Sequence, residues 1–432
     1  MNADAAAHST MPLWYAPTAT RAVDGTVHLP GSKSITNRAL VLAALTPGPT
    51  TVALPLWCRD TELMVEALRA LGTPIAVEGD RAVIGMVGSL AGRDTISVGN
   101  AGTVARFVPG VAALGNRSTR FDGDDRIRQR PIKPLIEALR RVGATITCGD
   151  NGGLPFTVVG SGSVRGGGVW LDGSASSQFV SALLLVGSQF EEGVNIRTAG
   201  GTPSGHHIRM TLDMLSAAGV PVVQTAMSWT VPPGRLRAKD LVVEPDLSSA
   251  APFVAAAVVT AGRIHFPGWP SRTTQPGDRL RDLASQMGAD CVLDGDGLTV
   301  VGPDRVRPLD VDLTDEGELT PVIAALLCFA TGPSRLRGIS HLRGHESDRL
   351  GALAKELSAL GPHVVETSDG LTIDPAVIRA GTFETYDDHR LVMAGAVVAL
   401  GGHSVAVADP SAVRKTYPKF VETWSELLGG AN

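Results

Sequence analysis

The chain has 432 residues, of which 44% are hydrophobic and 19% are charged, and its formal net charge is −5. This length exceeds the size at which a single hydrophobic core stops growing, so we expect two domains. The composition excludes a disordered chain and argues against nucleic-acid binding, which leaves small molecules as the expected partners.

The N-terminal segment MNADAAAHSTMPLW has no basic region followed by an apolar one, so it lacks the pattern of a secretory signal. Apolar runs such as ALVLAAL are interrupted well before the roughly 20 residues that span a bilayer. The four cysteines are scattered, with no CxxC pair and no histidine at metal-ligand spacing. We therefore expect a reduced, cytoplasmic chain with no structural metal and no membrane contact.

In chain order, a short polar segment followed by an apolar helix is predicted six times. Residues at corresponding positions, from Ser34 to His389, are 68 to 75 residues apart. Because each helix is apolar nearly all round, we expect these helices to be buried. The six segments are residues 33–45, 100–114, 174–186, 247–259, 317–330 and 387–400.

A second element recurs between these segments: an amphipathic helix that ends at glycine and is followed by a β-branched run. Such helices should bury one face and expose the other. Glycine just past a helix predicts a left-handed cap. Six units of about 70 residues divide naturally into two domains of three units each. The capping glycines are Gly72, Gly143, Gly219, Gly288 and Gly361.

Repeats also occur in solenoids and propellers, so a stacked, non-catalytic scaffold is an alternative interpretation. The six polar segments differ in composition, however, while the helices behind them stay alike. Variation at one place per unit favours a site built from helix N-termini, where unpaired N–H groups and the helix dipole attract anions.

The first polar segment carries cations at a helix end that already has partial positive charge. Lys33 opens it, and Ser34 and Arg38 lie one helical turn apart on the same face. Because the dipole mildly repels these cations, they are poor structural choices unless an anion binds there. Beside Gly31, they favour a phosphate or carboxylate site.

The next segments supply neutral donors. Gly102, in the motif NAGT, allows the backbone to approach a ligand closely. Ser176, Ser177 and Gln178 offer three short donors where a helix cap would use only one. Ser204 is either a further donor or simply a cap.

The last segments add charged groups. In RGHESDRL, Glu346 and Arg349 lie within one turn; a surface ion pair is the ordinary explanation for them. Arg390 and Lys415 follow near the end of the chain. Glu318 is the only acid that directly abuts its long apolar helix, where the dipole favours a carboxylate in any case. If the cations of the other segments converge on it, Glu318 becomes a candidate general base.

The motifs PGSKSITNRAL, NAGT, RPI, DGSASSQF, RGHESDRL, DDHR and KTYP, in this order, resemble those of the 5-enolpyruvylshikimate-3-phosphate (EPSP) synthase family, in a bacterial form. The resemblance extends from about residue 12 to residue 425. It implies an α/β fold of two similar domains, each an inside-out α/β barrel of three βαβαββ units, with a cleft between them. Residues 31–244 would form the inserted domain, and residues 1–30 with 245–432 the other.

The resemblance implies transfer of the enolpyruvyl group of phosphoenolpyruvate to the 5-hydroxyl of shikimate 3-phosphate, by addition and elimination with release of phosphate. This reaction belongs to the shikimate pathway, which leads to chorismate and the aromatic amino acids. No cofactor or metal is implied, and we expect a monomer. Both substrates are small polyanions, which accounts for cations at helix ends. We expect facing positive helix ends to open the empty cleft and the substrates to close it.

The resemblance also implies residue roles. Glu318 would accept the 5-hydroxyl proton, Glu346 would protonate the methylene carbon, and Lys33 would touch both substrates. The residues implied for shikimate 3-phosphate are Lys33, Ser34, Arg38, Ser176, Ser177, Gln178, Ser204, Glu318, His341 and His345. Those implied for phosphoenolpyruvate are Lys33, Asn100, Gly102, Arg126, Gln178, Arg349, Arg390 and Lys415.

The sequence departs from the family's pattern at four of these or neighbouring positions. Glu318 stands where Asp is frequent, His345 where Lys is found, His341 where Asn is common, and His207 where Tyr is frequent. A histidine that is neutral near pH 7 holds an anion less firmly than lysine does.

The sister enzyme that transfers enolpyruvyl to UDP-N-acetylglucosamine is the nearest alternative. That relative usually has a cysteine in the loop that here reads DGDDRIRQRP, and no cysteine is present. Its lysine is typically followed by asparagine, whereas Ser34 follows Lys33 here. Both differences favour the shikimate enzyme.

Overall fold

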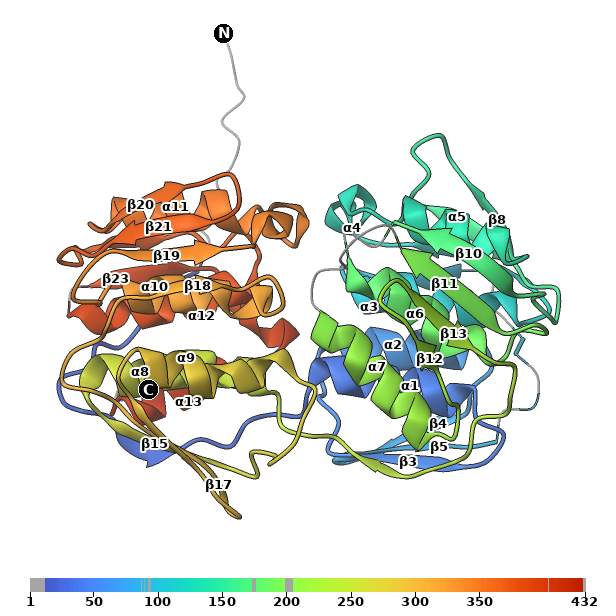
Figure 1. The fold of residues 1–432 in the computed structure, drawn as a ribbon, viewed down its shortest axis with the longest axis horizontal. Helices are drawn as coiled ribbons and strands as arrows, with labels where there is room; N and C mark the ends of the chain where they lie inside the picture. The colour runs from blue at the N-terminus through green and yellow to red at the C-terminus, as the bar shows by residue number, and fades with distance from the viewer. Residues whose placement is uncertain are drawn as a thin grey trace, which may run out of the picture.

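The computed structural model describes residues 12–86, 88, 90–91, 95–172, 176–198, 205–402 and 404–429. The chain forms two halves of similar construction that lie side by side (Figure 1). Each half has its own hydrophobic core. One cluster of buried side chains extends from Ile35 to Val243, and the other combines residues 16–27 with residues 247–424. The two cores thus fall inside the segments 31–244 and 1–30 plus 245–432.

Three sheets are completed by consecutive stretches of chain. In each, the first two strands pair in parallel and the other two add antiparallel, giving the order first, second, fourth, third. A helix follows each of the first two strands, which is the predicted βαβαββ unit. The strands are β6 (Thr95–Ser97), β7 (Ser118–Asp122), β8 (Thr145–Cys148), β9 (Phe156–Val159); β10 (Gly167–Leu171), β11 (Val194–Thr198), β12 (Val223–Gln224), β13 (Ser228–Val231); β18 (Asp310–Asp312), β19 (Ser334–Arg337), β20 (His363–Glu366) and β21 (Leu371–Asp374).

The other three sheets take a strand from a distant part of the chain. Strand β14 (Leu241–Val242) joins β3, β2 (Asp24–Thr26) joins β15, and β1 (Leu13–Tyr15) joins β23. The pairings of β2 and β1 bring the first strands of the chain into the half built mainly from residues 245–432, whereas β14 and β3 both belong to the other half. The remaining strands are β3 (Thr50–Ala53), β4 (Ile75–Glu78), β5 (Arg81–Ile84), β15 (Arg263–Pro267), β16 (Asp290–Leu293), β17 (Gly297–Val301), β22 (Gly381–Phe383) and β23 (Val405–Ala408).

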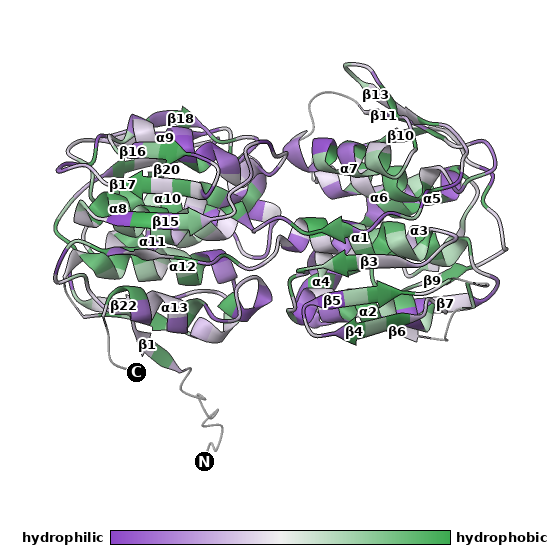
Figure 2. Cartoon of the chain, turned by 90° about the horizontal axis from the view of Figure 1, so that it is seen from below, coloured by the Kyte–Doolittle hydropathy of each residue, from purple (hydrophilic) through white to green (hydrophobic). Residues whose placement is uncertain are grey.

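The helices fall into the two predicted classes. Every residue of the inner helices α3 and α12 is buried, as their all-round apolar sequences predict. Hydrophobic residues fill the inside of each half, and hydrophilic ones gather where the halves face each other (Figure 2). The inner helices are α1 (Lys33–Ala44), α3 (Gly102–Ala113), α6 (Ser177–Gly187), α8 (Ala251–Thr260), α10 (Thr320–Leu327) and α12 (His389–Val398).

The outer helices bury one side only. Helix α5, for example, buries Leu135, Ile136, Ala138 and Leu139 and exposes charged side chains elsewhere. The five predicted capping glycines all have positive φ, from 82° to 125°, so the left-handed caps are confirmed. The outer helices are α2 (Arg59–Ala70), α5 (Lys133–Arg141), α7 (Gly205–Ala217), α9 (Leu280–Gln286), α11 (Arg349–Ala359) and α13 (Phe420–Leu427), and a short helix α4 (Asp125–Gln129) precedes α5.

The chain crosses between the halves at two adjacent places. The N–H of Ser32 donates to the carbonyl of Glu244 at 2.8 Å, and the N–H of Asp246 donates to the carbonyl of Pro30 at 2.8 Å. These bonds bind the two crossing segments to each other, so they form one connection rather than two independent linkers. No helix in the described ranges is both long and apolar enough to cross a membrane.

Candidate active site

One cavity between the halves is surrounded by helix N-termini from both. Helices α1, α3 and α6 of one half begin at it, and α11 and α12 of the other half begin opposite them. Unpaired N–H groups and helix dipoles at these ends favour anions. The predicted residues that line the cavity are Lys33, Ser34, Gly102, Ser176, Ser177, Gln178, Glu318, His341, His345, Glu346, Arg349 and Arg390.

Lys33 is held at the first residue of α1. The hydroxyl of Ser32 caps this helix by accepting from the N–H of Ile35, and Lys33 Nζ lies 3.2 Å from Asp60 Oδ2 on α2. Burial opposes the charged form of Lys33, but the carboxylates of Asp60 and Glu346 outweigh it and raise the lysine's pKa. Lys33 therefore remains an ammonium inside the cavity.

Gly102 keeps the start of α3 open to a ligand. A Cβ there would lie 2.9 Å from Arg106 Nη1 and 3.0 Å from Arg130 Nη2. The Arg106 guanidinium donates to Gln178 Oε1 at 2.6 Å, and burial and then the positive charge of Arg130 lower its pKa. Two guanidinium groups so close together, in a buried place, are costly unless an anion lies between them.

Glu318 lies beside two arginines and a histidine. Its Oε2 lies 3.8 Å from Arg390 Nη2 and 3.9 Å from His207 Nε2. Burial alone would raise the pKa of Glu318, but His207, Arg390 and Arg349 reverse the effect and lower it. Glu318 is thus a carboxylate, the form required of a proton acceptor.

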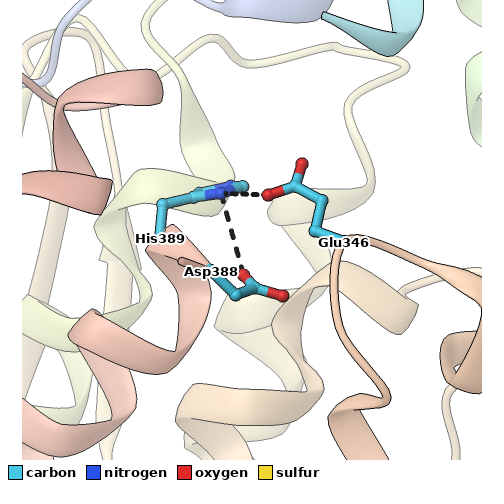
Figure 3. A group of neighbouring side chains, drawn as sticks. All are labelled: Glu346, Asp388 and His389. Atoms are coloured by element: carbon cyan, nitrogen blue, oxygen red, sulfur yellow. Dashed lines mark hydrogen bonds and ion pairs between the residues drawn. The ribbon is translucent and has the colours of Figure 1, made fainter. Parts of the chain in front are cut away.

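Glu346 belongs to a denser network, in which His389 bonds to it and also lies beside Asp388 (Figure 3). Lys415 Nζ lies 3.0 Å from its Oε1, and His389 Nδ1 lies 3.0 Å from its Oε2. Burial would raise the pKa of Glu346, but Lys415 and His389 hold it well below its usual value. Glu346 is therefore also ionised in this arrangement.

Glu346, Asp388 and His389 lie close enough to suggest a metal site, because their ligand atoms are all within 4.8 Å of one another. The oxygens of Asp388, however, accept from Arg349 Nε at 2.8 Å and Nη2 at 3.1 Å. Glu346 forms an ion pair with Lys415. Each carboxylate already has a protein cation as partner. The group is an ion-pair network, and it orients Arg349 toward the cavity.

The histidines that replace more common family residues are neutral. Burial first, and then the charges of Arg349 and His341, lower the pKa of His345 well below its ordinary value. Burial likewise lowers the pKa of His341, whose Nε2 has no hydrogen-bond partner among the described residues. These rings can exchange hydrogen bonds with a ligand but contribute no charge at neutral pH.

Residues 17–424 match the family described as EPSP synthase (3-phosphoshikimate 1-carboxyvinyltransferase). A curated protein of Kocuria rhizophila named 3-phosphoshikimate 1-carboxyvinyltransferase is 47% identical over 442 aligned positions, which cover 99% of each chain. The chain belongs to the EPSP synthase family. The family predicted from the seven ordered motifs is confirmed.

Two solved structures share the fold of this EPSP synthase family member. An EPSP synthase from Acinetobacter baumannii is 24% identical, over 96% of this chain and 97% of that one, with a TM-score of 0.81. The enolpyruvyl transferase NikO from Streptomyces tendae is 17% identical, over 95% and 96% of the two chains, with a TM-score of 0.73. The predicted fold class is therefore also confirmed.

Four residues predicted from the EPSP synthase resemblance do not line the cavity. Arg38 is buried beneath it and donates to Thr211 and Ser181 and to two backbone carbonyls. Arg126 is exposed and donates to the backbone carbonyl of Glu346 at 2.7 Å. The other two, Asn100 and Lys415, lie behind the lining and contact each other through the carbonyl of Asn100. Ser204 lies outside the described residues.

Several lining residues were missed from the sequence. The most important of them is Arg130, whose guanidinium lies next to Gly102. The prediction chose Arg126 instead, four residues earlier in the same loop. The signal was present, because Arg130 directly precedes Pro131 in the motif RPI that supported the EPSP synthase resemblance. The other missed lining residues with polar side chains are Ser32, Asp60, Thr103, Arg106, Asp246, Ser248, Gln275, His389 and Thr416.

Proposed function

We propose that this chain transfers the enolpyruvyl group of phosphoenolpyruvate to the 5-hydroxyl of shikimate 3-phosphate and releases phosphate. The single observation that carries the proposal is the convergence of Lys33, Arg349 and Arg390 with two ionised carboxylates, Glu318 and Glu346, in one cavity. Membership of the EPSP synthase family and the name of the relative that is 47% identical support the same reaction.

The cavity offers a side for each substrate. Hydroxyl and amide donors at the starts of α1 and α6, among them Ser34, Ser176, Ser177 and Gln178, suit shikimate 3-phosphate. Lys33 lies where both substrates would meet.

The phosphoenolpyruvate side is formed by guanidinium groups. Arg130, Arg349 and Arg390 line the cavity, and guanidinium binds both carboxylate and phosphate through paired donors. In this proposal Arg130 takes the place that the sequence assigned to Arg126. Arg126 instead holds the loop of Glu346 from outside the cavity.

The first chemical step is an addition. The 5-hydroxyl oxygen bonds to C2 of phosphoenolpyruvate, its proton passes to the carboxylate of Glu318, and C3 gains a proton to become a methyl group. The cations beside the cavity stabilise the negative charge of the phosphate as the tetrahedral adduct forms. Because Glu318 is ionised by its neighbours, it can accept this proton without any prior change of state.

The second step is an elimination in which Glu346 has the suitable form. A proton leaves the methyl carbon, the C2–O bond to phosphate breaks, and the enolpyruvyl double bond returns. Glu346 is a carboxylate bonded to Lys415 and can accept this proton. For the preceding addition Glu346 would have to take up a proton from water before it could deliver one to C3, although Lys415 lowers its pKa.

A coupled phosphate-release assay tests the proposal. Release should require both phosphoenolpyruvate and shikimate 3-phosphate, and Glu318→Gln or Lys33→Met should reduce it at least about 100-fold because each removes a proton acceptor or a central charge. The exposed positions Glu62→Gln and Lys133→Met are matched controls that should stay within about twofold of the natural chain.

The same assay with UDP-N-acetylglucosamine as acceptor distinguishes the alternatives. Release only with that acceptor would identify the sister transferase. If neither acceptor supported release, the chain would be a non-catalytic anion-binding protein and the proposed reaction would be withdrawn.

A further inference from the structure

A second cavity, with a volume of about 380 Å³, lies beside the active-site cavity and serves no role in the proposed reaction. Helices α1 and α7, strand β14 and the loop 272–274 of the other half surround it. Met210 on α7 lines both cavities. The volume falls in the range of small-molecule sites, about 300 to 1,000 Å³.

The wall of this second cavity is apolar on two helices. On α1 it is formed by Ile35, Ala39, Leu42 and Ala43, which recur at spacings of four and three and so share one face. This face of α1 lies toward β3 and β14, whose residues Thr50, Val52, Leu241 and Val242 line the same cavity. The small alanines on it leave room rather than fill it.

Helix α7 presents a matching stripe. Met210, Met214 and Ala217 are spaced by four and three residues and line the cavity, and Ala218, just after the helix, continues this wall. Methionine side chains adapt their shape to what they contact. Two helices with such apolar stripes would normally pack against each other. Here they leave a cavity between them that suits the apolar part of a ligand.

The rim carries cations whose charged groups are available. Arg237, Lys239 and Arg272 line the cavity and are exposed, and none of them makes a side-chain hydrogen bond or ion pair with another described residue. A carboxylate that enters this rim can therefore bond to them without displacing a protein partner.

Two of the three acids on the rim already accept protein donors. Asp240 Oδ1 accepts from the N–H of Thr51 at 2.7 Å, and Glu244 Oε2 accepts from Thr273 at 2.7 Å and from Gln275 at 2.8 Å. Asp213 is left as the one rim acid without a protein donor among the described residues. The rim therefore carries three cations and three acids, and its case for binding a carboxylate is that all three cations lack a protein partner among the described residues, whereas two of the acids already have donors.

We propose that this cavity is a second binding site, for a small amphipathic carboxylate. Its apolar body lies between the stripes of α1 and α7, and its carboxylate bonds to Arg237, Lys239 and Arg272 at the rim. Because Arg272 belongs to one half of the molecule and the other two cations to the other half, the ligand contacts both halves beside the connection between them. The binding site does not depend on the proposed reaction.

Calorimetric titration of the full chain with octanoate, and with octanamide as its neutral counterpart, tests the site. Octanoate should bind, and octanamide should bind at least tenfold more weakly because it lacks the charge that the rim recognises. Ala217→Trp, at an exposed position on the α7 stripe, should fill the cavity and abolish octanoate binding.

Charge variants separate the rim from general electrostatics. The double variant Arg237→Ala with Lys239→Ala, and separately Arg272→Ala, should each weaken octanoate binding at least fivefold. Arg235→Ala, an exposed arginine of the same segment that does not line the cavity, is the matched control and should leave the affinity unchanged.

Thermal melting of each variant shows whether it is folded. The proposal is overturned if octanoate does not bind, if octanamide binds equally well, or if folded Ala217→Trp still binds octanoate. An unchanged affinity in Arg272→Ala would overturn the contribution of the second half.

Discussion

Side chains around the active-site cavity divide into groups that keep their charge and histidines that lose it. Lys33, Glu318 and Glu346 are ionised because each has partners of opposite charge. His345 and His389 are held neutral, chiefly by burial. Because these rings are neutral in the folded chain, the free energy of unfolding should depend on pH.

Stability should begin to fall as the pH drops below about 6.5, the usual pKa of histidine. There the unfolded chain binds a proton at each of these histidines, and the folded chain, in which the pKa of His345 is lowered, does not. One such histidine would remove about 1 kcal/mol of unfolding free energy between pH 7.5 and 5.5. Urea unfolding at the two pH values measures the change.

The matched variant for this prediction is His345→Gln, which cannot be protonated. Its loss of stability between pH 7.5 and 5.5 should be smaller than that of the natural chain by about 1 kcal/mol. The lowered pKa values of Glu318 and Glu346 act in a separate window, since carboxylates lose their stabilising contribution only below about pH 4.3. Equal losses in both proteins would contradict a neutral His345.

Gly102→Ala should weaken phosphoenolpyruvate binding with little effect on stability. The added methyl group would meet the guanidinium ends of Arg106 and Arg130 at 2.9 and 3.0 Å, and flexible side chains can move away. We expect the KM for phosphoenolpyruvate to rise about tenfold, the loss of roughly one good contact to a charged group, about 1.4 kcal/mol. Steady-state kinetics and urea unfolding together measure the two effects.

Gly344→Ala is the control for this change. Gly344 also lines the cavity, but a Cβ there would meet nothing within 4 Å, so its KM values should stay unchanged. A Gly102→Ala protein with an unchanged KM for phosphoenolpyruvate would show that the start of α3 does not contact that substrate.

The sequence was sufficient to predict most of the cavity lining at this scale, but not to choose between neighbouring arginines. Arg126 and Arg130 lie four residues apart around the short helix α4, and only their positions in space distinguish the one that contacts Gly102 from the exposed one. Arg38 shows a second limit. Helical spacing placed Arg38 correctly beside Ser34. Its guanidinium, however, donates to the hydroxyls of Thr211 and Ser181, which are distant in sequence, rather than to a ligand in the cavity.

At the level of elements, glycine caps hold the outer helices in register with the strands that follow them. Gly361, after α11, has a φ of 125°, and a Cβ there would collide with the backbone carbonyl of Val377. Gly79 also has positive φ, 61°, but lies in open space. A substitution at Gly79 would therefore introduce backbone strain alone, whereas one at Gly361 would add a steric collision to the strain.

Gly361→Ala should lower the free energy of unfolding by more than about 2 kcal/mol, because strain and collision add. Gly79→Ala should cost only about 1 kcal/mol, from strain alone. Urea unfolding of both variants measures the difference. Equal costs at the two positions would show that the carbonyl of Val377 moves aside freely.

The periodic elements were predictable because their signals are local. Apolar helices, amphipathic helices and capping glycines follow from residues a few positions apart, and all three predictions are confirmed. The strands that complete the partial sheets were not predictable in this way. Strand β14, with two residues, pairs with β3 although they are far apart in sequence, so only the folded chain identifies its partner.

At the scale of the whole molecule, the halves are joined by one double connection and a few polar contacts across the cleft. Arg126 Nε donates to the carbonyl of Glu346 at 2.7 Å, and the N–H of Gly205 donates to Asp315 Oδ1 at 2.8 Å. Polar contacts of this kind, exposed or only partly buried, add little stability on their own. The polyanionic substrates, which in the proposed reaction would contact cations of both halves, should therefore decide how far the cleft closes.

Small-angle X-ray scattering tests this coupling. The radius of gyration should fall when phosphoenolpyruvate and shikimate 3-phosphate are added together, because the anions offset the repulsion between facing cations and helix ends. Arg126→Ala removes a contact across the cleft and should require higher substrate concentrations for the same fall. Arg128→Ala is the matched control, since its ion pairs with Asp122 and Asp125 lie within one half. A radius of gyration that the substrates leave unchanged in the natural chain would contradict closure, and equal behaviour of the two arginine variants would exclude Arg126 from it.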